Sequence, residues 1–235
     1  MFPSFQDRSN SLERLDTGDY TEAEYTKWLA EMRWINRMLG DARALKQTLR
    51  QEMIERANGP VSLLDIGAGC GELLKVARDS LGGTDPFLVG GDLAREGVMA
   101  VQARSAELGS VAVRCDAMHL PFEDDSFDFV ICSLFLHHLT DEQVVSVLNE
   151  MGRVASRHVV AIDLHRHPMA YFLYRVFSKI LLQPFTQQDG LLSILRAFRP
   201  AELQDVAAGS KLRNIEVRRS FPFRLVLSAR PETAQ

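Results

Sequence analysis

The fold is decided by the stretch Val61-Ser62-Leu63-Leu64-Asp65-Ile66-Gly67-Ala68-Gly69-Cys70-Gly71-Glu72. A short apolar run ends in an acidic residue, three glycines follow at alternate positions, and an apolar helical pattern begins at Leu73. The run from Val61 to Ile66 predicts a strand buried on both faces. Glycines let the backbone turn tightly and approach a ligand closely. A strand, a glycine turn and a helix in this order predict a nucleotide-binding unit.

The charges around this turn indicate which nucleotide it binds. The dinucleotide fingerprint G-x-G-x-x-G would place its third glycine at position 72, where this chain has Glu72. A carboxylate at that position would repel a pyrophosphate at the helix N-terminus. Asp65 adds a second negative charge just before the first glycine. These two acids favour a ligand with an ammonium group and no phosphate, and S-adenosylmethionine is such a ligand.

At these residues the chain resembles the class I S-adenosylmethionine-dependent methyltransferases, whose first motif reads D/E-x-G-x-G-x-G. Asp65, Gly67, Gly69 and Gly71 match it in full, although a generic tight turn between strand and helix would need similar glycines. The segment 120–133 also resembles the family's LPFxDxSFDxV stretch. The resemblance implies an α/β fold: a doubly wound, Rossmann-like sheet of seven mostly parallel strands with a C-terminal β-hairpin. It implies S-adenosyl-L-methionine as the cofactor.

Acidic residues end the next two predicted strands. Asp92 follows the strand 86–91 at about the distance from the glycines at which an acid meets ribose hydroxyls; it could also cap a helix over 93–108. For Asp116, after the strand 111–115, the resemblance implies contact with the adenine amino group, and an Asx turn is the alternative. The candidate cofactor-binding residues are Asp65, Gly67, Ala68, Gly69, Gly71, Asp92, Leu93, Asp116, Ala117, Met118 and Ser133.

Histidines follow the fourth and fifth predicted strands, at the end where open α/β sheets bind ligands. His137 and His138 follow the strand 127–132, and His165 follows the strand 158–164. A neutral imidazole could accept a proton from a phenol near pH 7; the alternative is that these histidines only pack or cap. No third metal ligand is spaced near the pair, so we predict no metal. The candidate catalytic residues are His137, His138 and His165.

Helical patterns outside the strands predict a lid and a cap. Helices over 21–39 and 41–57 form a predicted N-terminal helical lid, 1–57, in which residues 1–20 are expected to be partly loose. The remainder, 58–235, is the predicted methyltransferase domain, and its apolar helical insertion, 168–208, would roof the acceptor site; packing on the sheet or in a homodimer is the alternative. The substrate and lid candidates are Trp34, Asn36, His167 and Tyr171.

Composition limits the partners of the chain. Its 235 residues are 46% hydrophobic and 25% charged, with a net charge of −4, which argues against nucleic acid or an anionic membrane surface as a main partner. The three cysteines show no metal-type pairing and indicate a reducing, cytoplasmic location. We find no signal peptide and no apolar run long enough for stable membrane insertion.

The resemblance and the apolar insertion together predict a reaction. We expect methyl transfer from the sulfonium to an oxygen or carbon of a small aromatic or apolar acceptor, such as a phenol, a quinol or a polyketide-like molecule. Alternatives are a nicotinamide-dependent dehydrogenase and a non-catalytic S-adenosylmethionine-binding or regulatory protein on the same fold. A protein or RNA methyltransferase is disfavoured because the chain lacks a basic face and an N/D-P-P-Y/F motif.

Overall fold

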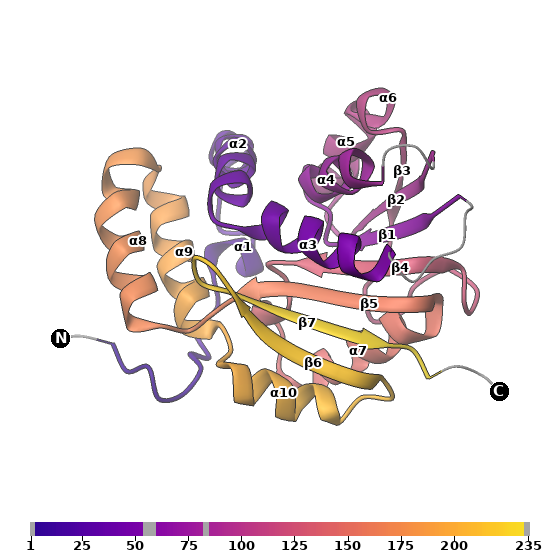
Figure 1. The fold of residues 1–235 in the computed structure, drawn as a ribbon. Helices are drawn as coiled ribbons and strands as arrows, with labels where there is room; N and C mark the ends of the chain where they lie inside the picture. Colours follow the sequence, from indigo (N-terminus) through magenta and orange to yellow (C-terminus); the bar gives the residue numbers. More distant parts are fainter. Residues whose placement is uncertain (1–2, 54–59, 82–84, 233–235) are drawn as a thin grey trace.

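A single seven-stranded sheet organises the chain in the computed structural model, which describes residues 3–53, 60–81 and 85–232 (Figure 1). The strand order is β3-β2-β1-β4-β5-β7-β6. The first five strands in the sequence pair in parallel, and β7 pairs antiparallel with both β5 and β6. The predicted doubly wound sheet with a closing hairpin is confirmed. The strands are β1 (Ser62–Ile66), β2 (Phe87–Asp92), β3 (Ser110–Arg114), β4 (Phe127–Ser133), β5 (Ala155–Leu164), β6 (Arg213–Ser220) and β7 (Arg224–Arg230).

Alternate residues of each central strand supply the cores on the two faces of the sheet, because side chains alternate along a strand. Leu63 belongs to the core formed with α3 (Asp41–Met53), α4 (Glu72–Ser80) and α5 (Arg95–Ala103). Its neighbour Leu64 belongs to the opposite core, formed with α7 (Asp141–Val154) and α10 (Pro200–Ala208). Both faces of the sheet are therefore covered, which explains the continuous apolar runs in the strands.

The strand order reverses between β1 and β4. From β1 the chain moves outward to β2 and β3, and it then returns to the other side of β1 with β4 and β5. Ligands of open α/β sheets bind at such a reversal, outside the carboxyl ends of the strands. The glycine turn after β1 and the histidine pair in the short 3-10 helix η1 (Leu136–His138) both lie at this edge.

Helices inserted around this edge cover it. Helix α8 (Pro168–Leu181) and helix α9 (Pro184–Arg196) form a hairpin at the side of the molecule, and α2 (Glu22–Met38) lies against α9 (Figure 1). Helix α3 packs on α4, β5 and β7, and α2 contacts α3 and α4 as well as α9. The division of the chain into a lid and a methyltransferase domain stays a prediction.

Three local predictions differ from the structure. The helix expected over 93–108 is two helices, α5 and α6 (Ser105–Leu108), because the backbone of Arg104 leaves the helical conformation at φ −106°, ψ 5°. Strand β5 begins at Ala155, directly after α7. Part of the segment expected to be partly loose is packed on the fold: it includes α1 (Arg14–Thr17), and Glu13 is buried. The predicted end of the helix from 41, at 57, lies outside the described residues.

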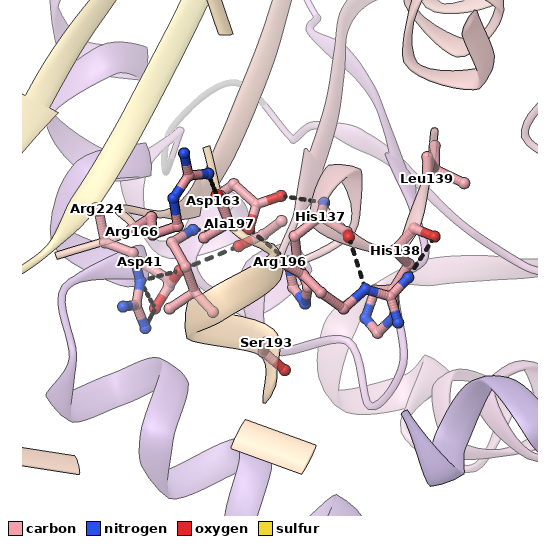
Figure 2. A network of polar contacts seen from close by, with 12 residues as sticks. Asp41, His137, His138, Leu139, Asp163, Arg166, Ser193, Arg196, Ala197 and Arg224 are labelled. Carbon is pink, nitrogen blue, oxygen red and sulfur yellow. Dashed lines mark hydrogen bonds and ion pairs between the residues drawn. The ribbon is translucent and has the colours of Figure 1, made fainter. Parts of the chain in front are cut away.

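A buried ion pair connects α3 to the closing strand. Asp41 begins α3 and is fully buried, and Arg224 begins β7 and is also buried. The guanidinium Nε lies 2.9 and 3.0 Å from the two Asp41 carboxylate oxygens, and Nη2 lies 2.8 Å from Oδ2 (Figure 2). Ser133 Oγ donates a further hydrogen bond to Asp41 Oδ1 over 3.2 Å. Each charge therefore depends on the other for its stability in the interior.

We predict that Asp41→Ala lowers the free energy of unfolding by about 3–5 kcal/mol, because it leaves the Arg224 guanidinium buried without its partner. The matched control is Glu232→Ala, which removes the partner of Arg213 from a pair more than half exposed on both sides, at 3.5 Å. That change should stay within about 0.5 kcal/mol. Urea unfolding measures both, and equal midpoints for the two variants would contradict the prediction.

Candidate active site

The glycine turn after β1 uses backbone conformations that favour glycine. Gly67, Gly69 and Gly71 have φ angles of +68°, +53° and +73°. A Cβ atom at Gly71 would also lie only 2.8 Å from Leu108 Cδ1. The N–H groups of Gly67 and Ala68 both donate to the carbonyl of Gly91, at 2.9 and 3.1 Å, so the turn is fastened to the end of β2. The D-x-G-x-G-x-G sequence therefore builds an open backbone cradle at the reversal of the sheet.

Asp92 connects this cradle to the next βα turn. Its Oδ2 accepts from the Gly69 N–H over 2.9 Å, and its Oδ1 accepts from the Ala94 N–H over 2.9 Å. The carboxyl lies against Gly97, where a Cβ would come within 2.6 Å of it. Burial raises the pKa of Asp92, and hydrogen bonds from the backbone N–H groups of Gly69, Ala94 and Leu93 oppose that rise. These three donors occupy three of the roughly four lone-pair positions of the carboxylate, so it can still accept from a ligand hydroxyl.

The negative charge around the turn is smaller than the sequence indicates. Asp65 is buried beneath the turn, and burial together with the nearby charge of Asp92 raises its pKa well above the ordinary value. Glu72 is buried and paired with Arg104, whose Nη1 lies 2.8 Å from Glu72 Oε1. Neither acid therefore supplies the free negative charge that the sequence predicts: burial favours the neutral form of Asp65, and Arg104 neutralises Glu72.

One cavity of about 850 Å³ lies over this edge of the sheet. At one end it is lined by the glycine turn, by Asp92 and by the segment 115–118 after β3. At the other end it reaches the two histidines of η1. Between them, apolar side chains of α2, α8 and α9 form the walls, among them Leu29, Met32, Leu173, Phe177 and Ile194. A nucleoside-sized ligand and a second small molecule could therefore lie in one continuous space.

A carboxylate orients each histidine at the second end of the cavity. His137 Nδ1 lies 2.6 Å from Oδ1 of the buried Asp163, whose Oδ2 accepts from the His137 N–H over 3.0 Å (Figure 2). His138 Nδ1 lies 2.7 Å from Asp16 Oδ1. Burial alone would raise the pKa of Asp163, but the charge of His137 and hydrogen bonds from it hold that pKa below its ordinary value. With Nδ1–H donated to Asp163, the Nε2 atom of His137 is the proton acceptor.

Glu13 stands next to both imidazoles. Its Oε1 is 3.9 Å from His137 Nε2 and 3.9 Å from His138 Nδ1, and it is buried without a hydrogen-bond partner. Its Oε2 accepts from Ser193 Oγ over 2.9 Å. Burial raises the pKa of Glu13 to about 7. The ligand atoms of Glu13, His137 and His138 lie within 4.8 Å of one another, a spacing compatible with a metal ion. Glu13 thus supplies a third potential metal ligand, which the sequence near the two histidines does not offer. The absence of a metal stays a prediction.

Arg196 holds this group together from α9. Its Nε donates to the His137 carbonyl over 3.2 Å, and its Nη2 donates to the His138 carbonyl over 2.7 Å (Figure 2). Its Nη1 forms an ion pair with Asp16 and lies 3.7 Å from Glu13 Oε1. One guanidinium therefore fixes the histidine turn and the N-terminal segment relative to each other.

Comparisons with known proteins agree with this geometry. Residues 63–158 match the model of a family described as a methyltransferase domain. A demethylmenaquinone methyltransferase of Thermus thermophilus is 29% identical over 166 residues, which are 68% of this chain and 72% of that protein. A ubiquinone/menaquinone biosynthesis C-methyltransferase of Xanthomonas campestris is 35% identical over 97 residues, which are 39% of this chain and 37% of that protein.

Solved structures share the fold at low sequence identity. The magnesium protoporphyrin IX methyltransferase of Synechocystis, solved with bound S-adenosylhomocysteine, has a TM-score of 0.63 at 14% identity, over 93% of this chain and 100% of that one. Human N-acetylserotonin methyltransferase, solved with S-adenosylmethionine, has a TM-score of 0.67 at 15% identity, over 94% of this chain and 63% of that one.

These matches support membership of the class I S-adenosylmethionine-dependent methyltransferases. The S-adenosylhomocysteine and S-adenosylmethionine bound in the Synechocystis and human structures support S-adenosylmethionine as the cofactor.

Most of the predicted site residues of this methyltransferase line the cavity. They are Trp34, Gly67, Ala68, Gly69, Asp92, Leu93, Asp116, Ala117, Met118, Ser133, His137, His138 and His165. Asp116 also forms the alternative Asx turn, because its Oδ1 accepts from the Met118 N–H over 2.9 Å. Among the lining residues, burial together with the charge of Arg219 lowers the pKa of His165 to about 4, so its imidazole is neutral near pH 7. The assignment of individual roles to these residues stays a prediction.

Four of the predicted residues of the methyltransferase do not line the cavity. Asp65 and Gly71 support the turn from below. His167 caps α8, with its Nδ1 accepting from the Met169 N–H over 3.1 Å. The ring of Tyr171 packs edge-on against Phe5, with 5.7 Å between the ring centres. For Asn36 the side chain lies outside the part of the chain that the structure describes.

Several residues at the second end of the cavity are missed by the sequence prediction. Glu13 and Asp16 come from a segment expected to be loose, and their partners Ser193 and Arg196 lie about 180 positions later. The acidic pair at positions 13 and 16 does have the spacing of a capping box, which forms around α1. Asp163, at the end of a central strand, could have been proposed as a partner for His137 from its position alone.

We predict that Asp92→Ala weakens the binding of S-adenosylhomocysteine by about 1–3 kcal/mol, because ligand hydroxyls lose a charged acceptor and the turn loses its fastening at Gly69. Asp79→Ala, on the half-exposed end of α4, is the control and should leave the affinity unchanged. Isothermal titration calorimetry measures both. Unchanged affinity in the Asp92 variant would remove this carboxylate from the cofactor site.

A second prediction concerns the pH dependence of stability. Because the pKa of Glu13 is about 7 in the folded state and near 4.5 when exposed, the folded state holds a proton that the unfolded state has released between these values. The contribution of this bound proton to the free energy of unfolding is fully present below about pH 4.5. It is lost as the pH rises through 7, and the loss reaches up to about 3 kcal/mol.

Glu13→Gln cannot ionise, so its stability relative to the wild type should increase from pH 5 to pH 8, as measured by urea unfolding across this range. Glu123→Gln, at an exposed position, is the control and should show no such trend. A constant difference between Glu13→Gln and the wild type would show that Glu13 ionises normally.

Proposed function

We propose that this methyltransferase transfers the methyl group of S-adenosylmethionine to an oxygen or carbon of a small aromatic or apolar acceptor, with phenols and quinols as the favoured class. The single observation that carries this proposal is the continuity of the cavity from the glycine turn to the histidine pair. Its volume of about 850 Å³ lies within the range of roughly 300–1,000 Å³ typical of ligand pockets. A cofactor at the first end leaves room for an acceptor at the second.

The chemistry of the second end supports an apolar acceptor with one polar group. The walls from α2 and α8 are built mainly of leucine, methionine and aromatic side chains. Polar side chains, among them Asp189 and Ser193 of α9, gather with Glu13, His137 and His138. A ring lying among the apolar walls would direct a hydroxyl group toward the histidines. The name of the Thermus relative, a demethylmenaquinone methyltransferase, agrees with an aromatic acceptor of this kind.

His137 is the proposed general base. Its Nδ1–H is held by Asp163 at 2.6 Å, which leaves Nε2 as the acceptor of the proton of a phenolic hydroxyl. His137 Nε2 would take that proton while the oxygen forms a bond to the methyl carbon of S-adenosylmethionine. The S–C bond would break in the same step, which would leave the neutral thioether of S-adenosylhomocysteine. Alignment of the oxygen, carbon and sulfur and exclusion of water supply most of the remaining rate enhancement.

At the cofactor end, the residues after β2 and β3 are the proposed readers of the nucleoside. Asp92 would accept from a ribose hydroxyl, and Asp116 would accept from the adenine amino group while the N–H of Ala117 donates to a ring nitrogen. The turn at Gly67 and Gly69 would let the backbone approach the methionine part. The homodimer and the cytoplasmic location stay predictions.

The competing function is that of a protein that binds S-adenosylmethionine without turning it over. The deciding experiment incubates the enzyme with S-adenosylmethionine and a panel of phenols and quinols, and measures S-adenosylhomocysteine by mass spectrometry. Release that depends on an acceptor supports methyl transfer. Tight cofactor binding by calorimetry without release on any acceptor would favour the non-catalytic function, and tight NAD binding instead would favour a dehydrogenase.

We predict that His137→Asn lowers kcat by about 100-fold or more on a phenolic acceptor, while the affinity for S-adenosylhomocysteine stays within about twofold. His119→Asn is the control, since this imidazole is 87% exposed, and it should retain full activity. Asp163→Asn should lower kcat as well, because it removes the partner that fixes the proton acceptor at Nε2. Full activity of His137→Asn would limit His137 to a packing role.

A further inference from the structure

Helix α8 carries an apolar surface that the rest of the described chain does not cover. Seven of its large apolar side chains are 37% or more exposed. Isolated exposed apolar residues are ordinary, but seven on one 14-residue helix form a continuous patch, and such patches mark interaction surfaces. They are Met169 57%, Phe172 59%, Leu173 37%, Val176 44%, Phe177 57%, Ile180 80% and Leu181 54%.

These side chains share one side of the helix. Met169, Phe172, Val176 and Ile180 recur at intervals of three and four residues, which places them in one stripe. The opposite side faces α9: Ser178 is buried, and the Tyr174 hydroxyl donates to the Thr186 carbonyl over 2.7 Å. In Figure 1, α8 stands at the left edge of the molecule, with α9 beside it on the side toward the sheet. The stripe thus faces away from the fold.

The only charged residues of α8 are basic and exposed. Arg175 and Lys179 are four positions apart, on one flank of the apolar stripe, and neither forms an ion pair with another described residue. The helix carries two positive charges and no negative charge in a chain whose net charge is −4. A wide apolar face flanked by basic side chains is the arrangement of helices that lie in the surface of an anionic bilayer.

We propose that α8 docks this enzyme on the surface of an anionic lipid bilayer, with Phe172, Val176 and Ile180 entering the boundary of the acyl chains. Arg175 and Lys179 then lie at the level of the phosphates. The contact is peripheral, since no helix within the described residues has both the length and the apolar character needed to cross a bilayer.

The position of the cavity agrees with this surface. Leu173, Phe177 and Leu181 line the cavity and are also exposed to solvent, so the apolar wall of the cavity continues onto the outside of α8. On a bilayer this outer continuation of the cavity wall would face the lipid. An apolar acceptor would then pass from the lipid into the cavity without crossing water. This last step rests on the proposed function; the docking of α8 does not.

The test is flotation of the full-length protein with vesicles of phosphatidylcholine alone and with vesicles that contain phosphatidylglycerol in equal part. We expect binding to the phosphatidylglycerol vesicles that is on the order of tenfold tighter, since each basic side chain near an anionic surface adds to the attraction. High salt should reduce the difference between the two vesicles.

Two double variants locate the contact. The double variant Phe172→Ser with Ile180→Ser changes two side chains of α8 that do not line the cavity, and it should reduce vesicle binding at least tenfold. Its control, Phe87→Ser with Met99→Ser at exposed positions of β2 and α5, should leave vesicle binding unchanged. Arg175→Gln with Lys179→Gln should remove the preference for phosphatidylglycerol, and Arg95→Gln with Lys211→Gln should keep it. Calorimetry with S-adenosylhomocysteine verifies that each variant is folded.

Equal binding of all variants, or no binding of the wild type to either vesicle, would overturn the proposal. A second outcome would overturn it in favour of another partner: light scattering could show a dimer in solution that Phe172→Ser with Ile180→Ser converts to a monomer, and then α8 pairs two copies of the chain. Because none of these measurements uses an acceptor, failure of the proposed methyl transfer would leave them interpretable.

Discussion

The guanidinium of Arg196 is the contact on which the histidine end of the cavity, the proposed acceptor end, depends. It donates to the carbonyls of His137 and His138 and pairs with Asp16, so three segments distant in the sequence meet at one planar group. Guanidinium is suited to this task because its five N–H donors are fixed in a plane and it remains charged in the interior. Without this guanidinium, no single side chain would join the carbonyls of His137 and His138 to Asp16 of the N-terminal segment. The shape of the second half of the cavity follows from this one side chain.

The two ends of the cavity are built by different means. At the cofactor end, backbone geometry dominates: glycines with positive φ form the cradle, and Asp92 fastens it through the N–H of Gly69. At the acceptor end, charged side chains from separate segments form the polar surface, and each charge is matched by an opposite one nearby. This difference fits a family in which one cofactor is shared and acceptors vary. A backbone cradle tolerates change in the side chains around it, and a side-chain cluster can be rebuilt residue by residue.

The sequence predicts the cofactor end well and the acceptor end poorly, for a physical reason. The strand, the glycine turn and the acids at strand ends are local patterns, and the topology of a parallel sheet brings all strand ends to one edge. Seven strands and most of the lining at that end follow from these patterns. The roles of Glu13 and Asp16 depend instead on contacts with residues about 180 positions away, for which a single sequence carries no periodic signal. The sequence also overestimates the negative charge around the glycine turn, because the ion pair of Glu72 with Arg104 exists only after folding.

The route of the N-terminal segment has a consequence for the order in which the protein is assembled. Residues 5–16 run along the second half of the chain: Arg166 donates to the carbonyls of Phe5 and Gln6, and the N–H of Ser9 donates to the carbonyl of Leu195. During synthesis this segment leaves the ribosome well before α9, the helix that receives it. The nascent chain could thus close its glycine turn while the histidine end of the cavity still lacks a wall. Both ends of the cavity would be complete only after α9 has been made.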